Sequence, residues 1–510
     1  MKRFIIVLLL ITLVFGTLAG CGKTAQSGSG EPQNTPSKSA EPGKPEDLSQ
    51  QAPYTVKLMF PGKYSKEDCD KVAELASAIT APKFNTKFDV VRSDFGTYKD
   101  DINMILASNE KLDLFFQYQD TFTASVNNGQ LVEIGQYFDK YAPEMKSQIS
   151  DVDWSCVTVD KGIYAMPANK EKAFAWGFVV VKKIADSLGV DYSKIKTEED
   201  LVPFLEAMKA KYPEFPPLSS NGGTMDTMTT MDDLGDGFGV LENCTDSNNR
   251  TVVNWYATDT FKKAVERRYE WVKKGLIAPD SVTITDSWAD LVMAGKAYSR
   301  FTNFKPGIME EIVKRTQGIE MVVIPLTETY STSSALNILW SVAHNSEKPE
   351  RTVQIMNEIY TNPELQNILC NGIEGRHWEY KNAEKTLVGY PKDMDSQTGL
   401  TYRSYTWAWM NEMITPVWEP AGVTLWKDTD EFNKKAINSP AKGFLWSNVD
   451  VMNEITACTV VRDKYKKALE CGSINPAEAL PKFLKELEDA GINNIIQEKQ
   501  KQLDAWFANK

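Results

Sequence analysis

Strand-like and helix-like segments alternate near the start of the chain, and this alternation limits the folds open to it. Three short apolar runs predict strands: YTVKLMF (54–60), TKFDVVR (86–92) and KLDLFF (111–116). The two segments between them, 72–79 and 102–108, have the apolar spacing of helices. A strand–helix–strand–helix–strand order predicts a parallel sheet with helices on its faces, so we expect an α/β fold.

The predicted strands end in turn-forming or polar residues. The first stops at Pro61-Gly62, and the third is followed by a polar segment that contains Tyr118 and Asp120. Because ligands of parallel sheets gather at the carboxyl ends of the strands, we expect these residues at the rim of a binding site. The Asp120 carboxylate would accept hydrogen bonds from ligand hydroxyls or an amine; the alternative is that it caps a helix at 121–125.

The chain has 510 residues, which is too long for one hydrophobic core, so at least two lobes are expected. Further helices and strands are predicted at 162–167, 172–183, 196–213, 259–280, 287–301, 318–326 and 337–375. The last seventy residues are predicted to be helical, with one apolar face made by Leu480, Phe483, Leu484 and Leu487. Gly472 and Pro476 stand where one helix should stop and the next begin.

The N-terminus has the layout of an export signal. Lys2 and Arg3 precede an apolar run at 4–15, which is shorter than the about 20 residues of a membrane-spanning helix. The run leads to LAGC (18–21), which resembles the bacterial lipobox, in which the cysteine thiol receives a diacylglycerol. We expect residues 1–20 to be a lipoprotein signal peptide and Cys21 to be lipidated; the alternative is a secretory signal with an incidental cysteine.

Residues 21–53 are rich in Gly, Ser, Pro and charge, and they cannot bury enough apolar surface to fold. As a lipidated disordered linker this segment would hold the folded body roughly 30 Å from its anchor. We therefore expect a globular body tethered to the cell membrane and facing the extracellular side.

Charge and motifs exclude several function classes. The net charge is −12, and removing a signal of +2 leaves −14, which argues against a nucleic-acid partner. Six cysteines besides Cys21 show no C-x-x-C spacing, so neither a zinc site nor a disulfide framework is predicted. The chain also lacks the common nucleotide, metalloprotease and serine-hydrolase motifs, and we expect no metal, no cofactor and no catalytic residue.

Several stretches together resemble the extracellular solute-binding proteins of family one, the lipoprotein receptors of ABC importers. They are the lipobox and linker, LASNEKLDLFF (106–116), GIYAMP (162–167), KKGLIAPD (273–280), WADLVMAGKAY (288–298), 346–369, GIEGRHWEY (372–380) and 442–506. The last of these is similar to the C-terminal region of a Firmicutes subgroup of sugar or peptide-like importers. The resemblance covers nearly the whole mature chain, and it is weakest between residues 215 and 255.

The resemblance implies a two-lobed, periplasmic-binding-protein-like (type II) fold with hinge crossovers. By analogy the first lobe comprises 54–165 plus 296–335, the second 166–295 plus 336–440, and a helical region at 441–510 packs on them. It also implies a monomeric receptor that delivers a small solute, most simply an oligosaccharide, to the permease subunits of an ABC transporter.

Thirteen tryptophans and nineteen tyrosines suit a site in which sugar rings stack on flat aromatic side chains. The candidates near predicted strand ends, crossovers or loops are Trp176, Trp288, Trp340, Trp378, Trp407 and Trp409. YTWAW (405–409) alternates, which predicts a strand with Trp407 and Trp409 on one face. We expect two or three of the six to line the cleft; for each, burial in the core is the competing interpretation.

The loop GIEGRHWEY (372–380) contains one of only two histidines in the chain. Its glycines permit tight turns, Glu374 and Arg376 can pair, and His377 is expected to bond locally or to rim the cleft. Glu374, His377 and Trp378 are therefore further candidate ligand-binding residues.

Two other function classes use similar residues. An extracellular glycan hydrolase would need two carboxyl groups, for which Glu374 and Glu379 are the candidates, but nothing in the sequence fixes their separation. A surface sensor or adhesin would use the same fold without transport. The sequence favours a binding receptor over both.

Overall fold

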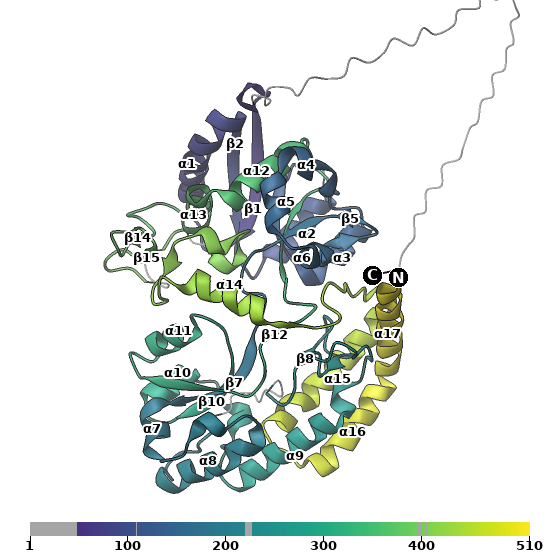
Figure 1. Ribbon diagram of the computed structural model, residues 1–510. Coiled ribbons are helices and arrows are strands. Elements are labelled where there is room, and N and C mark those ends of the chain that lie inside the picture. Colours follow the sequence, from purple (N-terminus) through teal and green to yellow (C-terminus); the bar gives the residue numbers. More distant parts are fainter. Residues whose placement is uncertain (1–47, 109, 220–226, 396–399, 403–404, 510) are drawn as a thin grey trace, which may run out of the picture. The chain divides into compact units, whose positions relative to one another are not determined.

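The computed structural model describes residues 48–108, 110–219, 227–395, 400–402 and 405–509 (Figure 1). The predicted signal peptide, Cys21 and the linker up to residue 47 lie outside these described residues. Within the described part, every helix is too short or too polar to cross a membrane. The six described cysteines are buried.

The first sheet has the strand order β2-β1-β3-β13-β6. Its strands are β1 (Tyr54–Pro61), β2 (Thr86–Ser93), β3 (Leu114–Tyr118), β6 (Ala165–Pro167) and β13 (Ile338–Val342). β1 pairs in parallel with β2, in the register Tyr54↔Thr86, and with β3, in the register Leu58↔Leu114. The predicted parallel α/β arrangement is therefore confirmed for the first three strands, whereas β13 is antiparallel to both of its neighbours.

The crossover helices of this sheet are α1 (Lys66–Phe84) and α2 (Tyr98–Ala107). Ser65 caps α1 because its hydroxyl accepts a hydrogen bond from the backbone N–H of Asp68. The acidic residues Glu67 and Asp68 in the first turn also face the positive end of the helix dipole. The helix ends at Asn85, which takes the left-handed conformation, with φ of 50°.

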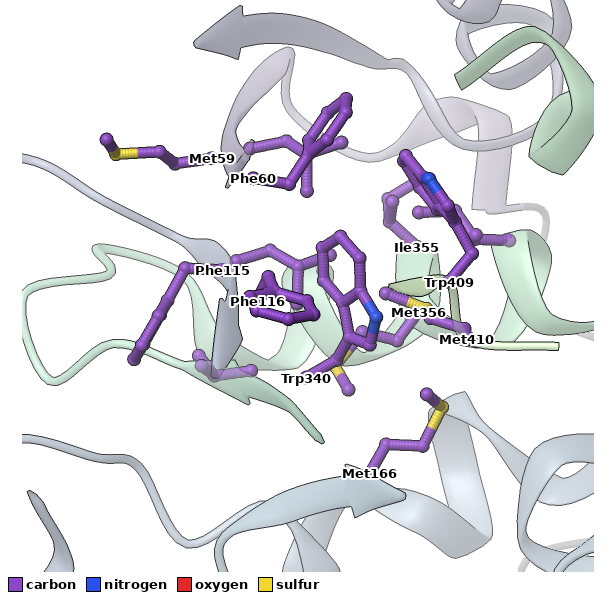
Figure 2. Packing of buried hydrophobic residues seen from close by; sticks show 14 of the residues in the cluster. Met59, Phe60, Phe115, Phe116, Met166, Trp340, Ile355, Met356, Trp409 and Met410 are labelled. Carbon is purple, nitrogen blue, oxygen red and sulfur yellow. The ribbon is translucent and has the colours of Figure 1, made fainter. Parts of the chain in front are cut away.

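Aromatic side chains pack among aliphatic ones in the core of the first sheet (Figure 2). The ring centroids of Trp340 and Trp409 are 5.0 Å apart, and Phe60 meets Trp409 edge-on at 4.7 Å. The indole N–H of Trp340 donates to the backbone oxygen of Ala408 over 3.0 Å. Both tryptophans are therefore part of the packing that holds β13 and the 405–409 segment together.

The second sheet is antiparallel and has the order β10-β7-β11. Its strands are β7 (Ala175–Val181), β10 (Ser299–Phe304) and β11 (Met321–Pro325). A separate core, which includes Phe178, Phe204 and Trp271, joins this sheet to α8 (Glu198–Lys211) and α9 (Asp259–Lys273). Thr197 and Asp200 form a capping box at the start of α8, where the sequence predicts a helix to begin.

The strand pairing reverses part of the expected division into lobes. Residues 296–335 were expected in the first lobe, but their strands β10 and β11 pair with β7 in the second sheet. Residues 336–440 were expected in the second lobe, but their strand β13 pairs with β3 in the first sheet. An apolar run shows that a strand exists but does not show which distant strand it pairs with. The assignment of these two segments to lobes by analogy was therefore wrong.

The C-terminal region is helical, as predicted. It contains α15 (Met452–Glu470), α16 (Pro476–Asp489) and α17 (Ile492–Ala508), which contact one another, and α15 and α16 also contact α9 (Figure 1). Gly472 and Pro476 separate α15 from α16 at the expected places. A Cβ atom at Gly472 would lie 2.4 Å from the backbone oxygen of Arg268, so only glycine allows this helix end to approach α9 so closely.

The remaining elements are short or connect the two sheets. The helices are α3 (Gln119–Asn127), α4 (Phe138–Tyr141), α5 (Pro143–Gln148), α6 (Asp151–Ser155), α7 (Lys182–Ser187), α10 (Trp288–Met293), α11 (Ile308–Arg315), α12 (Pro349–Thr361), α13 (Pro363–Asn371) and α14 (Leu425–Lys435). The strands are β4 (Thr158–Val159), β5 (Gly162–Ile163), β8 (Met231–Asp232), β9 (Leu241–Glu242), β12 (Tyr330–Ser331), β14 (Glu379–Tyr380), β15 (Leu387–Gly389), β16 (Val417–Trp418) and β17 (Ile437–Asn438).

Eight 3₁₀ helices complete the described elements. They are η1 (Leu48–Gln50), η2 (Gly135–Tyr137), η3 (Tyr192–Lys194), η4 (Trp255–Ala257), η5 (Ser281–Thr283), η6 (Thr406–Ala408), η7 (Glu412–Ile414) and η8 (Val449–Val451). The strand predicted at 405–409 is therefore wrong, because its central residues form η6. In that conformation Trp409 is buried, whereas Trp407 remains partly exposed.

Candidate ligand-binding site

A cavity of about 730 Å³ lies where β2 and β3 end. One wall comes from the first sheet and its helices, and the facing residues come from 234–236, 333–337 and 444–449. Tyr118 and Asp120 both line this cavity, at the strand end where the sequence places them. Pro61 and Gly62, the other two residues of the expected rim, do not contribute to its lining.

Asp120 is held by an ion pair at the surface of this cavity. Lys99 Nζ lies 2.6 Å from Asp120 Oδ2, with the two side chains 48% and 59% exposed, and 5.3 Å from the centre of the Tyr118 ring. The N-cap of α3 is Tyr118, so the alternative that Asp120 caps this helix is wrong. Exposed ion pairs contribute about 1 kcal/mol or less, and a ligand can compete for both groups at little cost.

The charge of this cavity favours a neutral ligand. Its charged lining residues are three carboxylates, Asp100, Asp120 and Asp236, and one ammonium group, Lys99. Lys99 compensates Asp120 and Lys499 compensates Asp236, so Asp100 supplies the negative charge that an anionic ligand would meet, whereas hydroxyl groups can donate hydrogen bonds to the carboxylates.

Three aromatic rings pack against one another beside the cavity. Phe95, which follows β2 and lines the cavity, lies 6.1 Å from both Tyr405 and Trp407, measured between ring centroids. Tyr405 and Trp407 are 5.9 Å apart, with their planes within 16° of each other. Phe95 is 37% and Tyr405 45% exposed, so both side chains are partly accessible to solvent. We call these three residues the aromatic platform.

A second cavity, of about 740 Å³, lies on the other side of the aromatic platform. Tyr405 and Trp407 line it together with three more aromatic residues, Tyr390, Trp418 and Trp426. Since Phe95 lines the first cavity and the other two rings line the second, the aromatic platform stands between them. Of the six tryptophans predicted from the sequence to bind the ligand, Trp407 is the one that lines this second cavity, and its side chain is partly exposed.

Two carboxyl groups, Glu171 and Glu412, also border the second cavity. Burial, followed by the negative charge of Glu171, raises the pKa of Glu412 to about 8. Burial opposes ionisation of Glu171 as well, but the charges of Lys170 and Lys305 outweigh it and lower its pKa to about 2. At neutral pH, Glu171 is therefore ionised and Glu412 holds a proton.

Three predicted tryptophans lie in the core instead of a cleft. Trp340 and Trp409 lie side by side in the packing shown in Figure 2. They have no exposed surface, and Trp288 is 3% exposed. Trp288 packs in a cluster with Val179 and donates from its indole N–H to the backbone oxygen of Ser299 over 3.3 Å. The competing core interpretation is therefore the one that the structure supports for these three residues.

Trp176 belongs to a third environment. It packs partly buried beside Phe174, with a ring-centroid distance of 6.4 Å, in the cluster that contains Tyr330. It is not among the residues that line either of the two cavities.

The loop at 372–380 is held by Asp68, in the first turn of α1. Arg376 Nε donates to Asp68 Oδ1 over 2.8 Å, so the expected pairing of Arg376 with Glu374 is wrong. His377 Nδ1 accepts from the N–H of Ile373 over 3.0 Å, and its Nε2 lies 3.5 Å from Asp68 Oδ2. Burial lowers the pKa of His377, so the ring is neutral at pH 7.

The structure gives the loop a packing role. His377 and Trp378 are 1% and 3% exposed. The exposed Glu374 and the edge of Trp378 border a separate cavity of about 790 Å³, which also includes Tyr380. The loop residues are therefore not gathered with Tyr118 and Asp120.

Some of the residues that line the first cavity were not identified from the sequence. Phe95 stands directly after a predicted strand, so the rule that selected Tyr118 would also have selected it. Asp236 and Trp446 lie in segments far apart in sequence and meet only in the folded chain, where the Trp446 indole N–H donates to Asp236 Oδ2 over 2.7 Å. Among the described residues, no group of three or more His, Cys, Asp or Glu side chains is arranged to hold a metal ion.

Residues 440–508 match a family described as a domain of unknown function (DUF3502). Over 446 residues the chain is 23% identical to a carbohydrate ABC transporter substrate-binding protein of Streptococcus pneumoniae serotype 4, covering 87% of this chain and 89% of the relative.

Several solved structures with the same fold are also described as carbohydrate-binding proteins. The N-glycan transport solute-binding protein NgtS of S. pneumoniae is 22% identical, with a TM-score of 0.74 over 90% of this chain and 100% of that one. Its complex with Man1GlcNAc has a TM-score of 0.64, over 89% and 99% of the two chains. An HMO-binding, ABC-transporter-associated solute-binding protein of Bifidobacterium longum infantis is 14% identical, with a TM-score of 0.63 over 89% of this chain and 99% of that one. These likenesses establish the two-lobed solute-binding fold that the sequence predicts.

Proposed function

We propose that this chain, which has the fold of the extracellular solute-binding proteins of family one, is a receptor that captures a neutral oligosaccharide for an ABC permease. The observation that carries the proposal is the aromatic platform, a group of partly exposed rings beside a large cavity at the strand ends. The relatives described as carbohydrate or glycan receptors support the same class of ligand.

The chemistry of a sugar matches these surfaces. A pyranose ring presents C–H groups on its faces and hydroxyl groups at its edges, so it stacks on an aromatic ring while its edge donates to carboxylates. Phe95 and Tyr405 supply such faces, and Asp120 and Asp236 supply acceptors at the cavity. The excess of carboxylates favours neutral sugars over uronic or sialic acids.

The structure gives no comparable support to a hydrolase. The catalytic carboxyl groups of a hydrolase would have to face the sugar. In this chain, Glu171 Oε1 instead lies 2.6 Å from Lys305 Nζ and 2.9 Å from Lys170 Nζ. Glu412 is only 4% exposed. Glu379 of the pair considered from the sequence is bound to Lys381 over 2.7 Å. We therefore assign these carboxylates to structural contacts.

A ligand screen tests the proposed function. The mature chain is mixed with neutral gluco-, manno- and N-acetylglucosamine oligosaccharides and with matched acidic ones, and its melting temperature is followed. A neutral oligosaccharide at 100 times its Kd should stabilise the fold by about 2.7 kcal/mol and remain chemically unchanged. A preference for acidic sugars, or release of new reducing ends, would contradict the proposal.

Membrane attachment is a separate part of the proposal. We propose that Cys21 carries the lipid and that residues 21–53 connect it to the folded body outside the cytoplasmic membrane. The order of basic residues, apolar run and LAGC supports this reading. Cys21→Ala should release the protein into the medium, and continued retention in the membrane fraction would contradict the anchor.

A further inference from the structure

The region that matches the domain of unknown function forms part of the first cavity. Six consecutive residues of this region, 444–449, line the cavity opposite the ends of β2 and β3. The segment is fixed to α17 by Gln502, whose side chain accepts from the Ser447 N–H over 3.1 Å and donates to the Ser447 oxygen over 2.9 Å. The terminal helix therefore holds this wall in place.

Trp446 of this wall is oriented by two further side chains. Its indole N–H donates to Asp236 Oδ2 over 2.7 Å, and the same carboxylate accepts from Lys499 Nζ, on α17, through Oδ1 over 2.5 Å. Lys499 has no exposed surface, also donates to the Gly239 oxygen over 3.1 Å, and lies 4.9 Å from the centre of the Trp446 ring. Charge-assisted bonds to a buried lysine hold the carboxylate in one orientation.

Asp236 retains capacity to bind a ligand. A carboxylate offers about four lone-pair positions. Oδ1 accepts from Lys499 and from the N–H of Phe238, over 2.5 Å and 3.0 Å, and Oδ2 accepts from Trp446. These three donors leave about one acceptor position, on Oδ2, which belongs to a residue that lines the cavity.

We infer that residues 440–508 supply a specificity-determining wall of the binding site, in which Trp446 stacks against a sugar ring and Asp236 Oδ2 accepts a hydroxyl of that ring. This inference rests on the proposed function and assigns a task to a region described only as a domain of unknown function. Lys499 and Gln502 are positioning residues, because they act through Asp236 and the 444–449 segment.

The facing wall fits the same ligand. Tyr118 and the Lys99–Asp120 pair line the same cavity, so a ring placed on Trp446 meets a second set of donors and acceptors. Recognition from both walls selects for the positions of hydroxyl groups as well as for the apolar face. A neutral hexose or N-acetylhexosamine unit within an oligosaccharide has both features.

The inference is tested with the full mature chain and the neutral oligosaccharide that responds best in the screen. Trp446→Ala should weaken binding by at least tenfold, measured by calorimetry, whereas Trp446→Phe keeps a ring and should lose only a few-fold. Phe507→Ala is the matched control, because it removes a half-buried ring from the same region that lies over Arg250 and not at the cavity. Its affinity should equal that of the wild type.

A double-mutant cycle tests the positioning role of Gln502. Gln502→Ala should weaken binding several-fold when Trp446 is present and should have little further effect in the Trp446→Ala background. A purely structural role would give losses that simply add, which would overturn this part of the inference.

The outcomes separate the inference from the proposed function. If the wild type binds a neutral oligosaccharide and Trp446→Ala binds it equally well, the wall has no part in recognition. This result would contradict the inference and leave the proposed function standing. If the wild type binds no sugar in the screen, the proposed function falls and the inference falls with it. If Trp446→Ala weakens binding while its unliganded melting temperature stays near that of the wild type, the loss lies in ligand contacts and supports the inference.

Discussion

Arg268 donates hydrogen bonds to both carboxylate oxygens of Glu198, from Nη1 to Oε2 over 2.7 Å and from Nη2 to Oε1 over 2.5 Å. Neither side chain is more than 1% exposed, so this bidentate pair joins α9 to the first turn of α8 in the protein interior. Burial opposes ionisation of Glu198, but Arg268 and the other donors around it lower its pKa overall. The carboxylate therefore remains charged inside the second core.

Removing one partner of this pair should be strongly destabilising. Arg268→Met leaves the Glu198 carboxylate buried without its main counter-ion, which typically costs about 3–5 kcal/mol of unfolding free energy. Lys274→Ala is the matched control on the same helix pair, since Lys274 and Glu206 are about half exposed, and such pairs contribute about 1 kcal/mol or less. Urea denaturation measures both, and equal losses would show that the buried pair has no special role.

The local elements could be predicted from the sequence because their signals are short-range. The run that became β1 stops where a proline and a glycine follow, and Thr197 starts α8 with acidic residues in its first turn. Helix and strand existence depends on neighbours within a few positions. The partner of a strand does not: β13 and β11 are equally apolar over five residues, yet one joins the first sheet and the other the second.

The site was predicted only in part for the same reason. Tyr118 and Asp120 could be placed at the rim of the cavity because a rule links strand ends to ligands. No rule of that kind distinguishes a tryptophan in a core from one in a cleft, and Trp340 and Trp409 proved to pack against each other while Trp407 stayed partly exposed. Which face of a ring is covered is decided by segments that are distant in sequence.

The aromatic platform should contribute to affinity without contributing much to stability. Phe95→Ala and Tyr405→Ala each remove a partly exposed ring that a sugar can stack on, and aromatic contacts are worth about 0.5–1.5 kcal/mol beyond their area. Each should therefore weaken oligosaccharide binding by about threefold to tenfold. Calorimetry gives the affinity, and thermal melting of the unliganded variants gives the stability.

The matched control for the aromatic platform is Tyr269→Ala. It removes a partly exposed ring from α9 that lies over Lys273 and outside both cavities. Its affinity should be unchanged. Equal weakening by Tyr269→Ala would mean that the variants act through the fold, and unchanged binding in Phe95→Ala would remove the platform from the site.

The protonated Glu412 should make stability depend on pH. Its pKa is raised from 4.5 to about 8, so between these values the folded chain holds a proton that the unfolded chain has released. The contribution of Glu412 to the free energy of unfolding is at its full value below about pH 4.5. It falls by up to about 1.4 kcal/mol per pH unit as the pH rises, and it is lost above about pH 8. Glu171 acts at lower pH, because its pKa is lowered to about 2 and its contribution is lost only as pH falls from 4.5 towards that value.

Glu412→Gln tests this titration because glutamine is neutral at every pH. Between pH 5.5 and 7.5 the wild type should lose about 2–3 kcal/mol relative to this variant, measured by urea denaturation at each pH. Glu419→Gln, which changes an exposed carboxyl group at the same cavity, should keep the wild-type slope. Parallel pH profiles for the wild type and Glu412→Gln would show that Glu412 is ionised in the folded chain.

Two glycines of the 372–380 loop should respond differently to the same substitution. Gly372 has φ of +83°, and a Cβ atom there would lie 2.5 Å from His377 Nδ1 and 2.8 Å from Tyr402 Cδ1. Both neighbours are buried, so neither can move aside without disturbing the core. Gly372→Ala should therefore lose about 1 kcal/mol from its left-handed backbone and about 1–3 kcal/mol more from overpacking.

Gly375 separates these two causes, because it has φ of +76° but no heavy atom within 4 Å of the Cβ position. Gly375→Ala should lose only the backbone part, about 1 kcal/mol, in the same urea measurement. Since the loop lies apart from Tyr118 and Asp120, both variants should bind the oligosaccharide with wild-type affinity. Equal losses of stability in the two variants would show that the side chains of His377 and Tyr402 can move away from the added Cβ atom. A loss of affinity in Gly375→Ala would show that this loop is part of the binding site.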